Sequence, residues 1–533
     1  MSNTIAAPGY AASSEHRTLF GHPLGLYVCF FTEMWERFSF YGMKALLLLF
    51  LISHHRFTQA TGYDLIGAYG GLVYAVPVIG GLIADRYLGM RRAVIFGGIL
   101  LVCGHIGMAY EGADATIVNG AVHRDGAALQ AMYLSLSLII VGVGFLKPNI
   151  STIVGKLYPE NDPRRDSGFT IFYAGINLGA AISAIVCGYL GETYGWKWGF
   201  GAAGIGMILG LLVFIFGQPH LHGHAEARRP ELLSERIMGL MREHWIYLLA
   251  IASVGVVSLL LQQHSLTLKL VPDFFEPSPI ELAMHAVTLC LLGGIGWFVI
   301  KQCSKVEREQ MIAVLLFIAV CLVFFTLYEQ TYGSWLLFSK YVMNKPMLFG
   351  KEVTASQLTS LGAIFIIALS PIVAWLWPRL EQMGINPSKP AKSALGLLFA
   401  GLSFVVLVYS ARHLQSNGLT NFWWFALAYL VLEIGEVVLS PIGLAAVTQL
   451  SVARVVSVMM GGWFLGTSYS EILAAGLGKL SAIDIPDDGT INVALALSKY
   501  DQLFVFSAKI GIGAAVVMFV LTPLVKKLMH GVR

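Results

Sequence analysis

Residues 23–52 read PLGLYVCFFTEMWERFSFYGMKALLLLFLI, a long and mostly apolar stretch with one compact group of charges in its middle. About 20 apolar residues are enough for a helix to cross a bilayer, so this length predicts a membrane span. Glu33 and Arg37 are four positions apart, Glu36 precedes Arg37, and Lys44 follows two turns later. Charges in the middle of a span are costly and by default indicate function, although a static buried salt bridge is the alternative.

The whole chain has the composition of a membrane protein. Of its 533 residues 56% are hydrophobic and 12% are charged, and the mean hydropathy is +0.70. Soluble domains are about a quarter charged, so a soluble, disordered, coiled-coil or disulfide-scaffold protein is excluded. The net charge is +4 and there is no basic stripe, so no nucleic-acid partner is expected.

Neither the cysteines nor the first residues indicate secretion. Met1 to Arg17 is polar and small, so no cleavable signal peptide is expected. The cysteines lie in or beside apolar segments without CxxC spacing, and we expect them to behave as buried small hydrophobes. They are Cys29, Cys103, Cys187, Cys290, Cys303 and Cys321.

Apolar runs long enough to cross a bilayer recur along the chain. Short loops join them, and none is long enough to be a soluble domain. The sequence therefore predicts an all-α polytopic membrane protein. Its fourteen expected spans are 23–52, 64–84, 92–110, 130–149, 168–191, 198–217, 245–268, 281–301, 311–343, 354–377, 391–412, 421–449, 456–480 and 503–526.

The spans divide into six, two and six around a polar break. We expect a first six-helix bundle in 1–217, a linker and two inserted helices in 218–310, and a second bundle in 311–533. Loop Lys and Arg favour one side by about two to one, which predicts that both termini are cytoplasmic. Paired bundles of this kind place substrate and ion sites at the midplane between the halves.

The break at 218–244 reads QPHLHGHAEARRPELLSERIMGLMREH. Its second part is predicted to be an amphipathic basic helix along the cytoplasmic surface. His220, His222 and His224 lie in a loop without a fourth fixed ligand, so no metal site is expected there.

Further charged residues lie inside predicted spans. Lys147 stands near the inner end of the fourth span, where a lysine that reaches to the interface is the alternative explanation. Glu329, Glu433, Glu436 and Glu471 lie in the second half, and of the pair three residues apart Glu436 is the preferred functional residue. Bases in the first half thus oppose acids in the second. This asymmetry fits a ligand with two opposite charges, or ion pairs that break and re-form between bundles.

A short loop after the second span contains Asp85 and Arg86, flanked by Gly81 and Gly89. Plain positive-inside anchoring explains its arginines but not Asp85 or the glycines. We therefore expect this loop to lock two helix ends through charge and capping contacts.

Seven motifs in order resemble those of the proton-dependent oligopeptide transporter (POT/PTR) family of the major facilitator superfamily, in its bacterial form. Glu33-x-x-Glu36-Arg37-Phe-x-x-Tyr41 is similar to the signature ExxERFxYY, with Phe40 in place of the first Tyr. The Asp85-Arg86 loop is similar to the superfamily's conserved loop. The remaining motifs are Phe145-Leu-Lys147-Pro-Asn, Gly175-Ile-Asn177-Leu-Gly, Tyr328-Glu329-Gln330, Gly435-Glu436 to Ser440-Pro441-x-Gly-Leu444, and Trp463-Phe464-Leu465.

The resemblance implies the major facilitator fold and a proton-coupled symporter of di- and tripeptides. Glu33, Glu36, Arg37 and Glu329 would couple proton movement to transport. Lys44–Glu329 would be the outer gating pair and Lys147–Glu436 the inner one. The chain would be a multi-pass protein of the bacterial cytoplasmic (inner) membrane, functional as a monomer, with the proton as coupling ion and no cofactor.

The resemblance also implies a peptide site. Arg37 and Lys147 would hold the peptide carboxylate, and Glu436 would meet its amino terminus. Tyrosine and Asn side chains would bond the peptide backbone, and two aromatic residues would line side-chain pockets. The implied substrate-binding residues are Arg37, Tyr41, Lys44, Tyr74, Lys147, Asn177, Glu329, Glu436, Trp463 and Phe464.

The sequence departs from the family pattern at three positions. Lys44 stands where the family usually has Arg, Phe325 replaces a common Trp, and Gly362 falls where an Asn-Pro pair is usual. Lysine keeps the charge but loses the bidentate fork of arginine. The peptide preference is therefore left open.

Three other functions compete with peptide symport. The same fold can carry another small anion or zwitterion, such as nitrate or an amino-acid-derived solute. An enzyme would need a nucleophile–base or metal constellation, and His105 stands isolated in its span. A passive channel is disfavoured, because opposite charges that can separate suit a gated cycle better than an open pore.

Overall fold

The computed structural model describes residues 18–159, 162–227, 229–264, 278–452, 454–486 and 491–532. Within them twelve helices are long and apolar enough to cross a membrane. Two further long helices fall outside this count: α1 carries the charged group in its middle, and α16 contains several small polar residues. The fourteen predicted spans thus correspond to fourteen long helices, which confirms the all-α membrane fold.

The helices of the first half are α1 Leu24–Ser53, α2 Gln59–Ile83, α3 Met90–Met108, α4 Gly126–Lys156, α5 Arg164–Tyr194 and α6 Trp196–Gly217. The inserted pair is α8 Arg242–Gln262 and α9 Pro279–Gln302; the predicted span end at 268 lies outside the described residues. The second half has α10 Lys305–Tyr328, α13 Ser360–Gln382, α14 Lys389–Arg412, α15 Phe422–Leu450, α16 Val456–Lys479 and α17 Val493–Leu528.

Shorter elements connect these helices. They are the π-helical turn η1 Ala84–Leu88, the 3₁₀ turns η2 Gln218–Leu221 and η3 Glu329–Tyr332, and the short helices α7 Glu231–Ser234, α11 Ser334–Tyr341 and α12 Ala355–Leu358. The antiparallel strand pairs are β1 Thr18–Leu19 with β2 His22–Pro23, β3 Thr116–Val118 with β4 Ala121–His123, β5 Arg236–Ile237 with β6 Leu240–Met241, and β8 Met347–Leu348 with β9 Lys351–Glu352. One parallel pair joins β7 Met343–Asn344 to β10 Thr420–Asn421.

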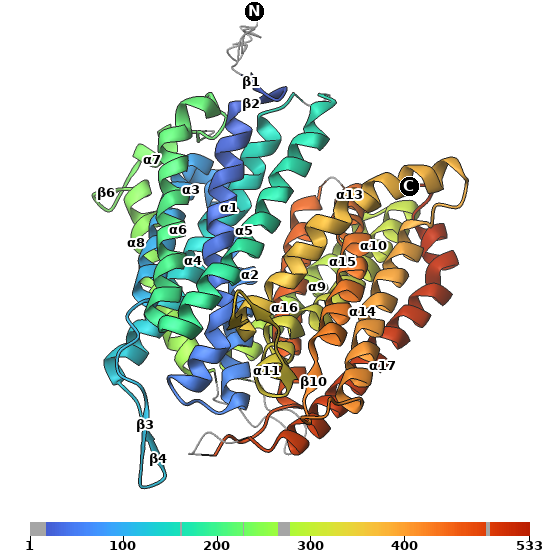
Figure 1. Cartoon of the computed structure of the whole chain (residues 1–533). Coiled ribbons are helices and arrows are strands. Elements are labelled where there is room, and N and C mark those ends of the chain that lie inside the picture. The colour runs from blue at the N-terminus through green and yellow to red at the C-terminus, as the bar shows by residue number, and fades with distance from the viewer. Residues whose placement is uncertain are drawn as a thin grey trace, which may run out of the picture.

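Two helical bundles lie side by side in Figure 1, one coloured blue to green and the other yellow to red. Helix α1 packs between α5 and α6, whereas α14 packs between α15 and α17. The bundles meet mainly where α16 runs along α2 and where α13 runs along α5. We call the end that carries β3 and β4 the hairpin end, and the opposite end, where α1 begins and α17 ends, the terminal end.

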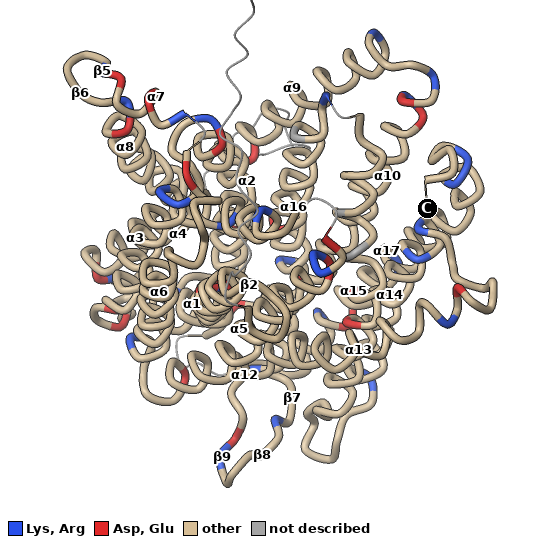
Figure 2. The backbone as a smooth tube through the Cα atoms, turned by 90° about the horizontal axis from the view of Figure 1, so that it is seen from above, with Lys and Arg blue, Asp and Glu red and all other residues tan. Residues whose placement is uncertain are grey.

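Charged residues are sparse along the helices and frequent in the loops and at helix ends (Figure 2). The interior of the first bundle is apolar, and Leu46, Leu48 and Leu51 of α1 are fully buried. A charge that does lie within the helices is therefore surrounded by groups that cannot solvate it.

The predicted amphipathic helix in 218–244 is wrong. The structure has η2, the four-residue α7 and the β5–β6 hairpin there, and α8 begins at Arg242. Gly239 adopts φ +87° in the hairpin turn, and Pro230 precedes α7. Glu235 leaves the helical conformation after α7, and the left-handed residues Met238 and Gly239 then form a turn that a helix cannot contain.

One predicted span is interrupted. The sequence predicts a continuous helix over 311–343, but η3 replaces its α-helical turns at Glu329–Tyr332 and Gly333 separates η3 from α11. Glu329 is therefore the first residue of η3, directly after the end of α10.

Close helix crossings depend on glycine. A Cβ built on Gly80 of α2 would lie 2.1 Å from the carbonyl oxygen of Gly144 in α4. We expect Gly80→Ala to destabilise the folded protein by about 1–3 kcal/mol, because the two backbones must separate. Thermal unfolding of the detergent-solubilised protein measures this effect. Gly255→Ala in α8 is the matched control, since nothing lies within 4 Å of its Cβ, and an equal melting temperature for both variants would contradict the expectation.

His55 follows α1 at the hairpin end and is 1% exposed. Burial, and then the positive charges of His54 and Arg124, lower the pKa of His55 from 6.5 to about 4. The unfolded chain binds a proton between these values while the folded chain does not, so stability falls as the pH drops from 6.5 towards 4. We expect a lower melting temperature at pH 5 than at pH 7 and a smaller difference in His55→Gln. The exposed His123 provides the control substitution, and an unchanged pH dependence in His55→Gln would contradict the expectation.

Candidate functional site

The charged group of α1 is buried and lies on one helix face. Arg37 Nε is 3.2 Å from Glu33 Oε1 and also contacts Glu36 Oε2, and the three side chains are 3%, 5% and 1% exposed. One further polar atom of each has no hydrogen-bond partner among the described residues: Arg37 Nη2, Glu33 Oε2 and Glu36 Oε1. Two acids thus share one base. The group has both an unbalanced charge and unused hydrogen-bonding capacity, which suits proton exchange or ligand contact better than a static pair.

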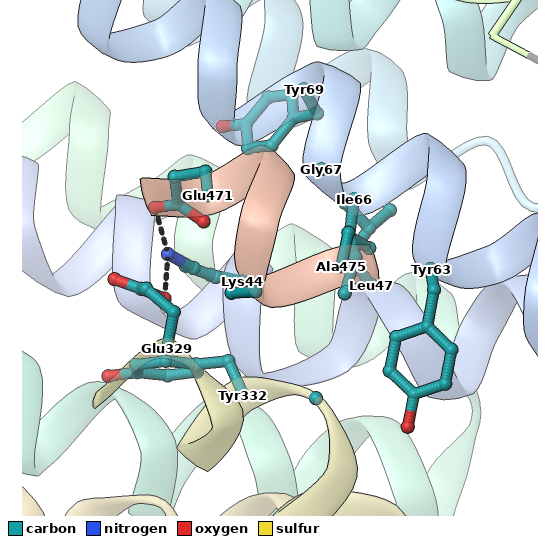
Figure 3. A pocket seen from close by; sticks show the side chains of 12 residues that line it. Lys44, Leu47, Tyr63, Ile66, Gly67, Tyr69, Glu329, Tyr332, Glu471 and Ala475 are labelled. Atoms are coloured by element: carbon teal, nitrogen blue, oxygen red, sulfur yellow. Dashed lines mark hydrogen bonds and ion pairs between the residues drawn. The ribbon is translucent and has the colours of Figure 1, made fainter. Parts of the chain in front are cut away.

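Lys44 connects the two bundles. Its Nζ donates to Glu329 Oε2 at 2.7 Å and to Glu471 Oε1 at 2.8 Å. Figure 3 shows Lys44 between these carboxylates, with the ring of Tyr332 below, 5.0 Å from Nζ to its centroid. The structure therefore places the predicted partners Lys44 and Glu329 together. It adds Glu471, which the sequence showed as an acid inside a span but to which no role was assigned.

Lys147 of α4 is half-buried and lies over the ring of Tyr74 from α2, with Nζ 4.2 Å from the ring centroid. Among the described residues no carboxylate lies within ion-pairing distance of it. Its predicted partner Glu436 is therefore not paired with it in this structure, and that gating pair stays a prediction. A carboxylate of a ligand can therefore pair with Lys147 without displacing a described acid.

The acids of α15 lie in the second bundle. Glu433 is 0% exposed, and neither of its carboxylate oxygens has a hydrogen-bond partner among the described residues. Glu436, one turn further, is half-buried, and its Oε2 has no hydrogen-bond partner among the described residues. A Cβ on Gly362 of α13 would lie 2.7 Å from Glu433 Oε1. The departure at Gly362 therefore makes room for this carboxylate.

The other predicted binding residues come from three helices. Asn177 of α5 is buried, and its Nδ2 donates to the Tyr173 carbonyl oxygen at 3.1 Å. Tyr41 of α1 stacks on Tyr332, with 6.0 Å between ring centroids. Trp463 and Phe464 of α16 are half-buried. These side chains lie on helices that meet at the interface of the bundles.

The predicted lock at Asp85 and Arg86 is not formed in this structure, so its role stays a prediction. Both side chains are exposed, and neither forms an ion pair with another described residue; Arg86 lies over the ring of Tyr87 instead. The loop is shaped by Gly89, at φ +75°, whose N–H donates to the Ala84 carbonyl oxygen. Backbone geometry, rather than Asp85, therefore ends η1 here.

Contacts across the bundles gather at the hairpin end. Glu192 of α5 accepts from Lys340 of α11 at 2.7 Å and from the Ser356 backbone N–H at 2.8 Å. Lys479 of α16 pairs with Asp64 of α2. Among the described residues, every ion pair between the two bundles lies in this half, Lys44 included. Ion pairs thus hold the two bundles together at the hairpin end.

Comparison with known proteins gives consistent results. The sequence profile of the POT family matches residues 91–485. The chain is 34% identical over 530 residues to the uncharacterized transporter YclF of Bacillus subtilis (strain 168), covering 98% of each chain. It is 30% identical over 533 residues to the di-/tripeptide transporter of Lactococcus lactis subsp. lactis (strain IL1403), covering 98% of this chain and 99% of the relative. A crystal structure of a POT family transporter in complex with a thioalcohol conjugated peptide superposes with a TM-score of 0.76 at 28% identity, covering 96% and 98%.

Proposed function

Because this chain belongs to the POT family, we propose that it imports di- and tripeptides across the membrane together with protons. The family profile and the relatives confirm the resemblance to this transporter family that the sequence motifs indicated. The relative from Lactococcus lactis is named a di-/tripeptide transporter, and the superposed structure holds a conjugated peptide. Both support a peptide as the substrate of this chain.

The distribution of unpaired charge carries the proposal. The first bundle presents Lys147 near the Arg37 group, without a described carboxylate at ion-pairing distance. The second bundle presents Glu433 and Glu436 without a cationic partner among the described residues. A peptide has a carboxylate and an ammonium group at opposite ends, so it supplies both missing charges at once. Desolvated charge pairs of this kind are among the stronger polar contacts in binding sites.

In this proposal Lys147 and Arg37 hold the peptide carboxylate, and Glu436 meets its amino terminus. Tyr41, Tyr74 and Asn177 bond the backbone, while Trp463 and Phe464 line side-chain pockets. Binding through termini and backbone tolerates varied side chains. It also distinguishes a peptide from a simple anion, which lacks the ammonium group.

The proton-coupling roles are part of the same proposal. Glu33, Glu36 and Glu329 are the candidate proton-binding residues. A proton on one of these carboxylates weakens its ion pair with Arg37 or Lys44, and loss of the proton restores that pair. The terminal end faces the cytoplasm of a bacterium, as the excess of basic residues in its loops supports. The hairpin end, where ion pairs join the bundles, then faces outside, and this structure is the conformation closed to the outside. We expect the monomer to function without a cofactor other than the coupling proton.

Uptake of labelled dialanine into proteoliposomes tests this proposal. With an inside pH of about 7.5 and a more acidic outside, we expect accumulation above the equilibrium level, and its loss when a protonophore removes the gradient. Competition separates the substrate classes: dialanine with a free amino and carboxyl group should compete, whereas N-acetylated and C-amidated dialanine should compete weakly. Accumulation that ignores the gradient would refute proton coupling. Equal competition by nitrate and dialanine would favour the anion transporter instead.

A further inference from the structure

The cavity of Figure 3 contains one base and two acids. Its lining includes Lys44 from α1, Glu329 from η3 and Glu471 from α16, and Lys44 is the one basic residue in that lining. The side chains are 10%, 11% and 6% exposed respectively. With all three ionised, the group has a net charge of −1 in a site that is largely shielded from water.

Among the described residues, neighbouring elements place no second cation within ion-pairing distance of Glu329 or Glu471. The other described titratable side chains whose charges act on it include Tyr41 of α1, Tyr69 and Tyr74 of α2, Lys147 of α4 and Tyr332 of η3. The nearby Lys479 pairs with Asp64, so its charge is already balanced. At contact distance, therefore, no second described cation balances the charge excess of the Lys44 group.

Glu471 is held in place rather than free to turn towards solvent. A Cβ on Gly70 of α2 would lie 2.6 Å from the Glu471 carboxyl, so this glycine lets the α2 backbone approach the carboxylate directly. One turn before Glu471, Ser468 donates to the Gly71 carbonyl oxygen and ties α16 to α2. Both glutamates thus contact the same ammonium group from fixed positions on two different elements.

Resting on the proposed symport function, we propose that Glu471 is a proton-binding residue of the transport cycle, which shares one transported proton with Glu329 at the hairpin-end gate. One carboxylate binds the proton and becomes a neutral carboxyl, and the other stays ionised and keeps Lys44. Two like charges beside one base favour uptake of a proton, because burial leaves the unneutralised charge poorly solvated.

The consequence for the gate follows from this charge balance. With the proton bound, the Lys44 group is neutral and stabilises the closed hairpin end. Without the proton, one negative charge is in excess, which favours separation of the bundles and entry of water. Protons arriving from outside would therefore close this gate, and proton loss would reopen it.

The test compares Glu471→Gln and Glu329→Gln in proteoliposomes, with labelled dialanine and an interior pH dye recording peptide and proton flux together. Either substitution leaves Lys44 with a single glutamate, a group that is neutral without a proton. We expect both single variants to have the same phenotype: gradient-driven accumulation and the dependence on outside pH are lost, while exchange of labelled for unlabelled peptide remains. Glu471→Asp keeps the second acid and should restore the pH dependence.

The matched control is Glu192→Gln, which removes one partner of the balanced Lys340 pair in the same half of the protein. We expect it to change the rate of uptake and not its pH dependence. Coupled uptake by Glu471→Gln with the pH dependence and proton-to-peptide ratio of the unsubstituted protein would overturn the inference and leave the proposed function intact. Absence of gradient-driven uptake by the unsubstituted protein would instead refute the proposed function itself.

Discussion

Lys147→Ala is expected to weaken peptide binding by about 30-fold to 4,000-fold, because removing one member of a desolvated charge pair costs about 2–5 kcal/mol and each 1.4 kcal/mol is a factor of ten. Lys147 already lacks a carboxylate partner among the described residues, so its loss leaves no protein acid unpaired. The effect should therefore fall on the ligand rather than on folding. Isothermal calorimetry with dialanine measures the affinity, and thermal unfolding measures the stability.

Two variants of the same helix provide controls for this prediction. Lys147→Arg keeps a positive charge and should retain part of the affinity, although its planar fork places the charge differently. Lys156→Ala changes a lysine in the last turn of α4 and should leave binding nearly unchanged. Unaltered affinity in Lys147→Ala would show that the peptide carboxylate binds elsewhere. Loss of the folded protein would show that Lys147 has a structural role.

Glu33→Gln is expected to abolish gradient-driven accumulation while peptide exchange continues. In the structure Arg37 is shared by Glu33 and Glu36, and the three side chains are at most 5% exposed. Glutamine has nearly the same shape as glutamate but cannot bind and release a proton. It leaves Arg37 with one partner and removes the excess negative charge, so the bundle stays folded while this group no longer titrates.

Accumulation and counterflow assays in the same proteoliposomes measure this separation, and Glu33→Asp is the control that keeps an ionisable group. A static buried salt bridge predicts the opposite pattern. In that case Glu33→Gln lowers the melting temperature, and accumulation and exchange fall together with the amount of folded protein. Intact coupling in Glu33→Gln would place the proton at Glu36, Glu329 or Glu471.

The helices were predictable because their signal is local. A run of about 20 apolar residues identifies a span whatever surrounds it, so the starts of α1 and α15 lie within one residue of those expected. The errors also have local causes. The hairpin turn at Met238 and Gly239 outweighs the amphipathic pattern in 218–244, and Gly333 interrupts a span that is mostly apolar.

The sequence predicted which residues belong to the candidate site, but it predicted less well which of them form ion pairs. Charges inside spans single out Glu33, Arg37, Lys44, Lys147 and Glu329 directly, because burial makes each of them costly. Hydropathy does not say which of several acids a base will meet. The sequence therefore gave no reason to pair Lys44 with Glu471 as well as Glu329, or to leave Lys147 without Glu436.

The sequence by itself thus determined where the chain crosses the membrane, which charges are buried there, and the family to which the chain belongs. Only the tertiary structure decided that Lys44 is shared by two glutamates, that Glu433 lies against Gly362, and that ion pairs between the described parts of the bundles gather at the hairpin end. The reason is physical. Burial follows from the composition of each segment, whereas an ion pair across an interface depends on how two separately packed bundles approach each other.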